Sequence, residues 1–204
     1  MTPVPIRVLV ADDEVLIRGA VEALLGLEED IEVLPGASTG DAAVAAAREH
    51  RPDVCLLDLE MPGLDGVDAA REILRSVPAK VVIFTRHARP GVLRRALADQ
   101  VAGFVPKSTP AEQLADVIRQ VAAGRRYVDP EIAASALTAE RSPLTDRELD
   151  VLREGRRAGR VEDIAAALHL APGTVRNHLS SAIGKLGVRT RQEAAQRAWE
   201  AGWI

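Results

Sequence analysis

Five polar residues are placed where they could handle a phosphoryl group. Each lies at the end of a short apolar run of the chain. They are Asp12, Asp13, Asp58, Thr85 and Lys107. A carboxylate can attack phosphorus, further carboxylates can hold Mg²⁺, and a hydroxyl and an ammonium can contact phosphoryl oxygens. The set predicts phosphoryl transfer to an acidic side chain, provided that the fold brings the five residues together.

Each residue type suits one part of that reaction. Asp58 is the expected nucleophile and would become an aspartyl phosphate. Asp13 and Asp58 are expected to bind Mg²⁺ directly, and Asp12 through water. Lys107 supplies a positive charge for a phosphoryl oxygen, and Thr85 supplies a hydroxyl that can follow the phosphoryl group. Each residue taken alone has a simpler structural explanation, because an Asp pair before a helix is often only an N-cap. Five such residues at the ends of predicted strands are harder to explain by chance.

The apolar runs have the character of buried strands. They are continuously apolar rather than alternating, which predicts burial on both faces of a parallel sheet. The predicted strands are Ile6–Ala11, Ile31–Pro35, Val54–Leu57, Lys80–Phe84 and Gly103–Val105. Segments with apolar residues at helical spacing lie between or after them. These predicted helices are Val15–Leu25, Ala42–Arg48, Val67–Leu74, Val92–Ala98 and Leu114–Ala122.

This alternation predicts an α/β fold with a doubly wound, five-stranded parallel sheet over residues 1–123. Crossovers between parallel strands are right-handed, so few topologies remain. In the order 2-1-3-4-5, the carboxyl ends of strands one and three are neighbours at the point where ligands bind. The acidic residues follow those two strands, so we expect them to meet at one edge of the sheet.

The pattern of apolar strands does not continue after residue 123. Residues 124–143 are charged and contain Gly124, Pro130 and Pro143, which predicts a linker with one short helix at Pro130–Leu137. Residues 144–204 predict an all-α domain of four helices, beginning with a capping box between Thr145 and Glu148.

Two of these helices have the geometry of a helix-turn-helix. A short helix at Val161–Leu168 is followed by a turn and by a longer helix at Gly173–Lys185, with Pro172 in its first turn. The longer helix has a buried apolar stripe and an outward polar face that carries Arg176 and Asn177, which suits major-groove reading. A plain helical bundle is the alternative that the pattern leaves open.

Residues 1–123 resemble the receiver domains of two-component response regulators. The resemblance rests on Asp12–Asp13, on Asp58–Leu–Glu–Met–Pro–Gly63, on Thr85 and on Gly103–Phe–Val–Pro–Lys107. It implies a CheY-like fold, phosphorylation of Asp58 by a sensor histidine kinase, and a Mg²⁺ ligand from the Glu60 carbonyl. It also implies that Thr85 and Phe104 form a switch that remodels the receiver surface. One departure is Arg86, because the residue after the switch threonine is commonly small.

Residues 144–204 resemble the helix-turn-helix output domains of the NarL/LuxR (FixJ) class. The motifs are Leu144–Thr–Asp–Arg–Glu148, Ile164–Ala165, Thr174–Val–Arg–Asn–His178 and Lys185–Leu186, and further details resemble the DesR-type subfamily. The resemblance implies binding of a double-stranded DNA operator. A last helix at Gln192–Trp203 is expected to pair two output domains on DNA, and packing of its apolar stripe within its own domain is the alternative. The expected DNA contacts are Thr174, Arg176, Asn177, Ser180 and Lys185.

Composition agrees with this class of protein. The chain has 204 residues, enough for two modest domains, and a net charge of −4, with acidic residues in excess before residue 144 and basic ones after it. Its apolar runs are too short to cross a bilayer, which predicts no membrane partner. The single Cys55 lies in an apolar run and is expected to be a buried thiol. A cytoplasmic location is expected.

The sequence therefore predicts a transcription regulator that is not an enzyme. Phosphorylation of Asp58, with Mg²⁺ as cofactor, should promote a homodimer that binds DNA. Two alternatives stay open: a receiver switched by a ligand or partner, and an aspartyl-phosphate phosphatase in which Glu60 is the general acid.

Overall fold

The computed structural model describes residues 4–86, 92–93, 96–97, 99–137, 142–157 and 159–204. The chain divides into two compact units, of which the first ends at Ala134 and the second contains residues 142–204. Each unit has its own hydrophobic core. None of the helices in the described part of the chain is long and apolar enough to cross a membrane.

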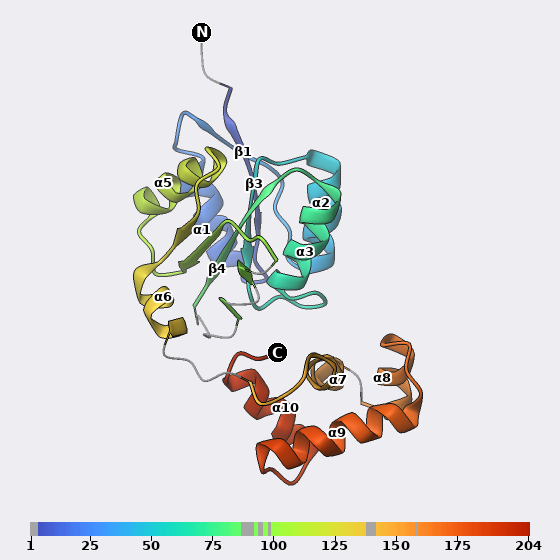
Figure 1. Cartoon of the computed structure of the whole chain (residues 1–204). Helices are drawn as coiled ribbons and strands as arrows, with labels where there is room; N and C mark the ends of the chain where they lie inside the picture. Colours follow the sequence, from blue (N-terminus) through green and yellow to red (C-terminus); the bar gives the residue numbers. More distant parts are fainter. Residues whose placement is uncertain (1–3, 87–91, 94–95, 98, 138–141, 158) are drawn as a thin grey trace. The chain divides into compact units, whose positions relative to one another are not determined.

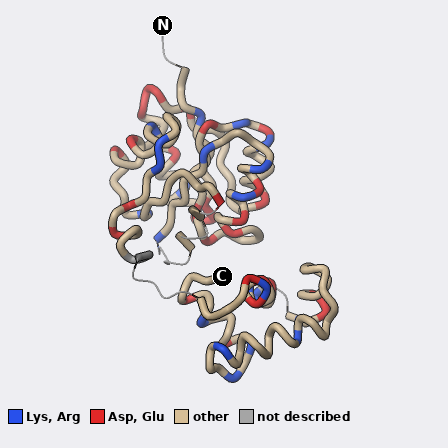
Figure 2. The backbone as a smooth tube through the Cα atoms, viewed as in Figure 1, with Lys and Arg blue, Asp and Glu red and all other residues tan. Residues whose placement is uncertain are grey.

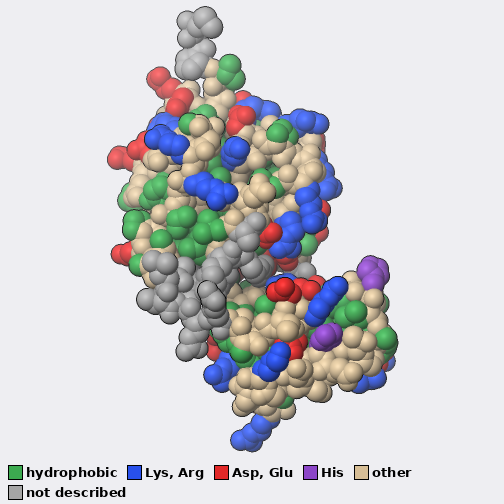
Figure 3. Space-filling view, viewed as in Figure 1, with side chains coloured by type: hydrophobic (Ala, Val, Ile, Leu, Met, Phe, Trp, Pro, Cys, Tyr) green, Lys and Arg blue, Asp and Glu red, His purple; other side chains and the backbone are tan. Residues whose placement is uncertain are grey.

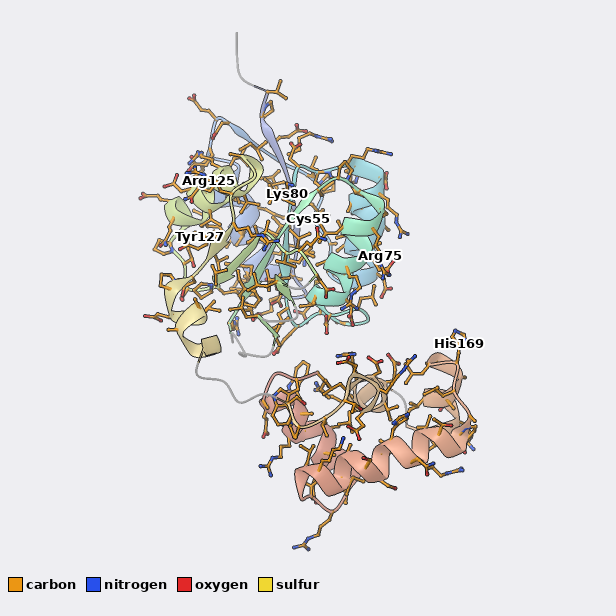
Figure 4. The ribbon with its side chains drawn as sticks, viewed as in Figure 1. Cys55, Arg75, Lys80, Arg125, Tyr127 and His169 are labelled. Carbon is orange, nitrogen blue, oxygen red and sulfur yellow. The ribbon has the colours of Figure 1, made fainter. Side chains whose placement is uncertain are left out.

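A parallel sheet of six strands forms the centre of the first unit. The strands are β1 (Ile6–Ala11), β2 (Ile31–Val33), β3 (Val54–Asp58), β4 (Lys80–Thr85), β5 (Gly103–Pro106) and β6 (Tyr127–Val128). Their order is β2-β1-β3-β4-β5-β6, so the predicted order of the first five strands is confirmed. Val54–Leu57 of β3 are fully buried, as their continuous apolar run predicts, and Cys55 lies inside the sheet (Figure 4).

Helices cover both faces of this sheet. They are α1 (Val15–Leu25), α2 (Gly40–His50), α3 (Gly66–Ser76) and α5 (Ala111–Ala122). Figure 1 shows α1 and α5 on one face and α2 and α3 on the other. The buried stripe of α5 shows why this segment is a helix, since Leu114, Val117, Ile118 and Val121 repeat at helical spacing. The helix predicted at 92–98 includes residues outside the described ranges.

The sixth strand lies in the segment that the sequence predicts to be a linker. The backbone N–H groups of Tyr127 and Asp129 donate to the carbonyls of Ala102 and Phe104, both at 2.9 Å. These bonds pair the edge of β5 that would otherwise be left open. The Asp129 carboxylate then caps α6 (Pro130–Leu137), the short helix that the sequence predicts. The start of the predicted linker is therefore bound to the sheet.

Four helices form the described part of the second unit. They are α7 (Asp146–Arg157), α8 (Val161–Ala167), α9 (Pro172–Leu186) and α10 (Arg191–Glu200). The predicted capping box is confirmed, because the Thr145 N–H donates to the Glu148 carboxylate at 2.7 Å and the Glu148 N–H to the Thr145 hydroxyl at 3.4 Å. Between α8 and α9, His169 turns the chain with a left-handed φ of 54° and is exposed (Figure 4). Figure 3 shows histidine side chains at the surface of the second unit.

Candidate functional site

Three carboxylates meet at the carboxyl edge of the sheet. β1 and β3 are neighbours in register, with Ala11 opposite Leu57, so Asp12 and Asp58 leave the sheet side by side. One oxygen from each of Asp12, Asp13 and Asp58 lies within 4.8 Å of the others. Asp12 and Asp58 are buried and Asp13 is exposed. The structure thus brings together the acidic residues that the sequence predicts to share a site.

This cluster can hold a divalent cation. Three carboxylates in close proximity repel one another unless a cation lies between them, and hard oxygen donors of this kind are what Mg²⁺ prefers. The exposed Asp13 leaves one side of the cluster open to water, which suits an ion that keeps part of its hydration shell. The residues present therefore fit the predicted ion.

Two glycines shape the loop after Asp58. A Cβ on Gly66, the first residue of α3, would lie 2.1 Å from the Asp58 carbonyl oxygen. Gly63 has a φ of +77°, and a Cβ there would lie 2.3 Å from the Asp41 carboxylate. Gly66 can therefore lie against the end of β3 because it lacks a side chain, and Gly63 adopts its positive φ without strain.

Lys107 lies among the carboxylates. Its ammonium is 2.7 Å from Asp12 Oδ2, 3.1 Å from Asp58 Oδ2 and 3.2 Å from Glu14 Oε1, and its side chain is only 5% exposed. Burial lowers the pKa of Lys107, but its close ion pairs with Asp12 and Asp58 outweigh burial and leave that pKa raised. Burial raises the pKa of Asp58, and the hydrogen bond and charge of Lys107 offset part of this effect.

Thr85 and Phe104 occupy neighbouring strands on the same face of the sheet. Ile83 of β4 pairs with Phe104 of β5, and Thr85 is two residues beyond Ile83, so the side chains of Thr85 and Phe104 point to the same side. Both are buried, at 2% and 1% exposed. The ring of the predicted switch is thus inside the protein in this structure.

An open cavity of about 260 Å³ leads to Asp58. It is lined by Asp13, Glu14, Asp58, Glu60, Thr85, Arg86 and Lys107. The sequence predicts most of these residues at the site, but it does not predict Glu14. The available signal was its position, directly after the Asp12–Asp13 pair. Glu14 Oε2 lies 2.5 Å from the Arg86 guanidinium, so the unusual residue after Thr85 is held at the cavity wall.

In the second unit, α9 presents an exposed polar face. The predicted DNA contacts, which are Thr174, Arg176, Asn177, Ser180 and Lys185, are all exposed. Figure 2 shows that most of α9 carries no charge, in contrast with the mixture of acidic and basic positions elsewhere. Arg176 forms an exposed ion pair with Glu162 of α8 at 3.3 Å.

Lys185 has a partner that the sequence did not predict. Its ammonium lies 2.7 Å from the Glu148 carboxylate, and Glu148 is 3% exposed. Burial raises the pKa of Glu148, but hydrogen bonds from Lys185, Ser181 and Thr145 outweigh burial and lower that pKa to about 2. The Glu148–Lys185 pair ties the start of α7 to the end of α9.

Comparison with known proteins identifies relatives for both units. The family described as response regulator receiver domain matches residues 8–119, and bacterial regulatory proteins of the luxR family match residues 142–198. The transcriptional regulatory protein DesR of Bacillus subtilis (strain 168) is 41% identical over 199 residues, which cover 98% of this chain and 99% of DesR.

Solved structures agree with these matches. The response regulator ChrA of a heme-sensing two-component system is 28% identical, with a TM-score of 0.58 over 98% of this chain and 99% of ChrA. The response regulator RcsB in complex with DNA is 22% identical, with a TM-score of 0.64 over 97% of this chain and 98% of RcsB, and thus shares the fold. The two families that the motifs resemble are confirmed, a receiver domain and a luxR-family regulatory domain.

Proposed function

Because the chain belongs to the response regulators that join a receiver domain to a luxR-family regulatory domain, we propose that phosphorylation of Asp58 controls its binding to DNA. The phosphoryl donor is the phosphohistidine of a sensor histidine kinase. The target is a double-stranded DNA operator, and the active form is a homodimer. The observation that carries the proposal is the Asp58 carboxylate, which is buried beside Lys107 and opens on a cavity of about 260 Å³.

Asp58 is suited to be the nucleophile. One of its carboxylate oxygens attacks the phosphorus, the bond from phosphorus to the donor nitrogen breaks, and the imidazole leaves with the bonding electron pair. Lys107 lies 3.1 Å from Asp58 Oδ2 and can contact a phosphoryl oxygen. Thr85 also lines the cavity, where its hydroxyl can reach the same group.

Mg²⁺ would be held by Asp12, Asp13, Asp58 and the backbone carbonyl of Glu60. When bound, the ion neutralises charge on the transferred group and offsets its repulsion by the carboxylates. The fold places two of these ligands next to each other, because Asp12 and Asp58 lie at the ends of adjacent strands.

The phosphorylation test uses a small donor. Acetyl phosphate with Mg²⁺ should add one base-labile phosphoryl group to the full chain, seen as a single mass increase. Asp58→Asn should abolish it. Asp53→Asn is the matched control, because Asp53 directly precedes the same strand, far from the cavity, and its carboxylate accepts the Arg7 N–H at 2.8 Å. Single-site labelling that persists in Asp58→Asn would reject the acceptor, and steady hydrolysis of a phosphomonoester would favour a phosphatase.

Recognition of DNA is assigned to α9. The proposed contacts are Thr174, Arg176, Asn177, Ser180 and Lys185. Removing Arg176 with Ala should cost about 1–3 kcal/mol if it contacts a base edge, and it should relax specificity there. If Arg176 contacts phosphate, binding should weaken evenly across sequences and depend less on salt. Unchanged affinity for a selected operator in both Arg176→Ala and Asn177→Ala would reject α9 as the reading helix.

Dimerisation is the proposed link between the two events. One short recognition helix gives limited affinity, whereas two half-sites about one helical turn apart would engage a dimer. α1 exposes Val15 and Leu16, at 71% and 83%, and α10 is the proposed contact between output domains. Light scattering with and without beryllofluoride and Mg²⁺ should show a change from monomer to dimer, with tighter DNA binding. Tighter DNA binding by a protein that remains a monomer would reject this step.

A further inference from the structure

The Glu14 side chain does not perform the local role that its position suggests. Glu14 is the N-cap residue of α1, but its side chain makes no capping hydrogen bond. It lies instead on the cavity wall and bridges two cations, with Oε1 at 3.2 Å from Lys107 Nζ and Oε2 at 2.5 Å from the Arg86 guanidinium. We call Glu14, Arg86 and Lys107 the Glu14 bridge.

Lys107 donates a hydrogen bond to Glu14 while this bridge is intact. An ammonium has three N–H groups. In this structure three carboxylates surround it, those of Asp12, Glu14 and Asp58. A phosphoryl oxygen that takes the Lys107 donor now bound by Glu14 must therefore displace that carboxylate.

Of the three carboxylates, Glu14 can leave at the lowest free-energy cost. The Asp12 side chain is 2% exposed, so an unpaired charge there would remain buried, and Asp58 itself carries the phosphoryl group. The Glu14 side chain is 39% exposed and can turn into water. Its departure frees the Arg86 guanidinium at the same time.

We propose that Glu14 occupies the place of two phosphoryl oxygens and yields Lys107 and Arg86 to the phosphoryl group on Asp58. This inference rests on the proposed function and deepens it, because it assigns Arg86 as a second cation for the phosphoryl group. A carboxylate that binds one cation with each oxygen resembles a phosphoryl group in charge and in its paired acceptors. Arg86 lines the cavity and is 54% exposed, so the guanidinium has room to change partners.

Beryllofluoride with Mg²⁺ tests this assignment without any turnover. Its affinity for the full chain is measured by calorimetry. Arg86→Ala should weaken binding about three- to tenfold, and Arg86→Lys should recover part of the loss. Glu14→Gln should tighten binding about three- to tenfold, because the competitor is gone. In an Arg86→Ala background, Glu14→Gln should increase the affinity for beryllofluoride by a smaller factor, since one of the two released cations is missing.

The chain offers a matched pair of control variants. Arg75 and Glu72 form an Arg–Glu ion pair at 3.3 Å on α3, and Figure 4 shows Arg75 on that helix. Arg75→Ala and Glu72→Gln make the same charge changes away from the cavity and should leave beryllofluoride affinity unchanged. A titration with Mg²⁺ alone separates an effect on the metal from an effect on the anion, and far-UV circular dichroism checks that each variant is folded.

Two results would overturn the assignment. If Arg86→Ala binds beryllofluoride as tightly as the native chain, or if Glu14→Gln changes only the affinity for Mg²⁺, the Glu14 bridge has no part in holding the phosphoryl group. If the native chain and Asp58→Asn both fail to bind beryllofluoride, the proposed function itself is wrong, and the assignment falls with it. If only the Glu14 bridge assignment fails, the native chain still binds beryllofluoride, so this failure can be distinguished from failure of the proposed function.

Discussion

Replacing Glu148 with Gln should destabilise the second unit by about 1–2 kcal/mol at neutral pH. The glutamine keeps the shape of the side chain and can still accept the Thr145 N–H, so the change removes mainly the charge that faces Lys185 at 2.7 Å. The reduction in the pKa of Glu148 from its ordinary value of 4.5 to about 2 corresponds to at most about 3.4 kcal/mol. The Lys185 side chain is 36% exposed, so solvent screening reduces that figure.

The same pair makes this contribution depend on pH. The folded-state pKa lies below the unfolded one, so the stabilisation is fully present above about pH 5 and is lost as the pH falls toward 2. More than half of it should be gone at pH 3. The difference in unfolding free energy between the native chain and Glu148→Gln should shrink accordingly.

Tryptophan fluorescence in urea measures this directly. The chain has two tryptophans, and both lie in the second unit, where Trp199 packs under the Arg156 guanidinium and Trp203 is buried. Glu200→Gln is the control, because Glu200 is an exposed acid of α10 and should change stability by less than about 0.5 kcal/mol. A Glu148→Gln protein as stable as this control at pH 7, or equally destabilised at pH 7 and pH 3, would refute the reasoning.

Three further changes test other parts of the structure. Gly66→Ala should destabilise the first unit by about 1–3 kcal/mol, because its Cβ would meet the Asp58 carbonyl oxygen. Gly19→Ala on the open face of α1 should be neutral or stabilising, and thiol labelling of Cys55 in urea compares the two. His169→Gly should stabilise the second unit by about 0.5–1 kcal/mol, read by tryptophan fluorescence, because glycine adopts a positive φ without strain. Native Cys55 should resist alkylation at pH 8, since burial raises its pKa to about 12, and rapid labelling would contradict its burial.

Local patterns explain why much of the fold could be predicted. Val54–Leu57 is apolar at every position, and a strand of that kind has to be covered on both faces. The capping box at Thr145 and Glu148 depends on a spacing of three residues within one turn of helix. The acidic site followed from the same logic, because parallel strands bring their carboxyl ends to one edge.

The unpredicted features depend on contacts between distant parts of the chain. Tyr127–Val128 is too short to have a strand pattern and is ordered by the open edge of β5. The Glu148–Lys185 pair joins residues on different helices, α7 and α9, which no helical spacing relates. No sequence pattern indicates the Glu14 bridge, because Arg86 follows β4 and Lys107 follows β5, and both strands are distant from Glu14 along the chain.

The parallel topology also sets the order in which the two units should fold. Each strand of the first unit pairs with one that is far along the chain, as with Val8 and Val54, so a long loop must close before any pairing stabilises it. The second unit is built from helices joined by short turns, whose first contacts are local. Chains rich in local contacts fold faster than those that depend on distant pairings. During refolding, the second unit should therefore be complete while the sheet is still assembling.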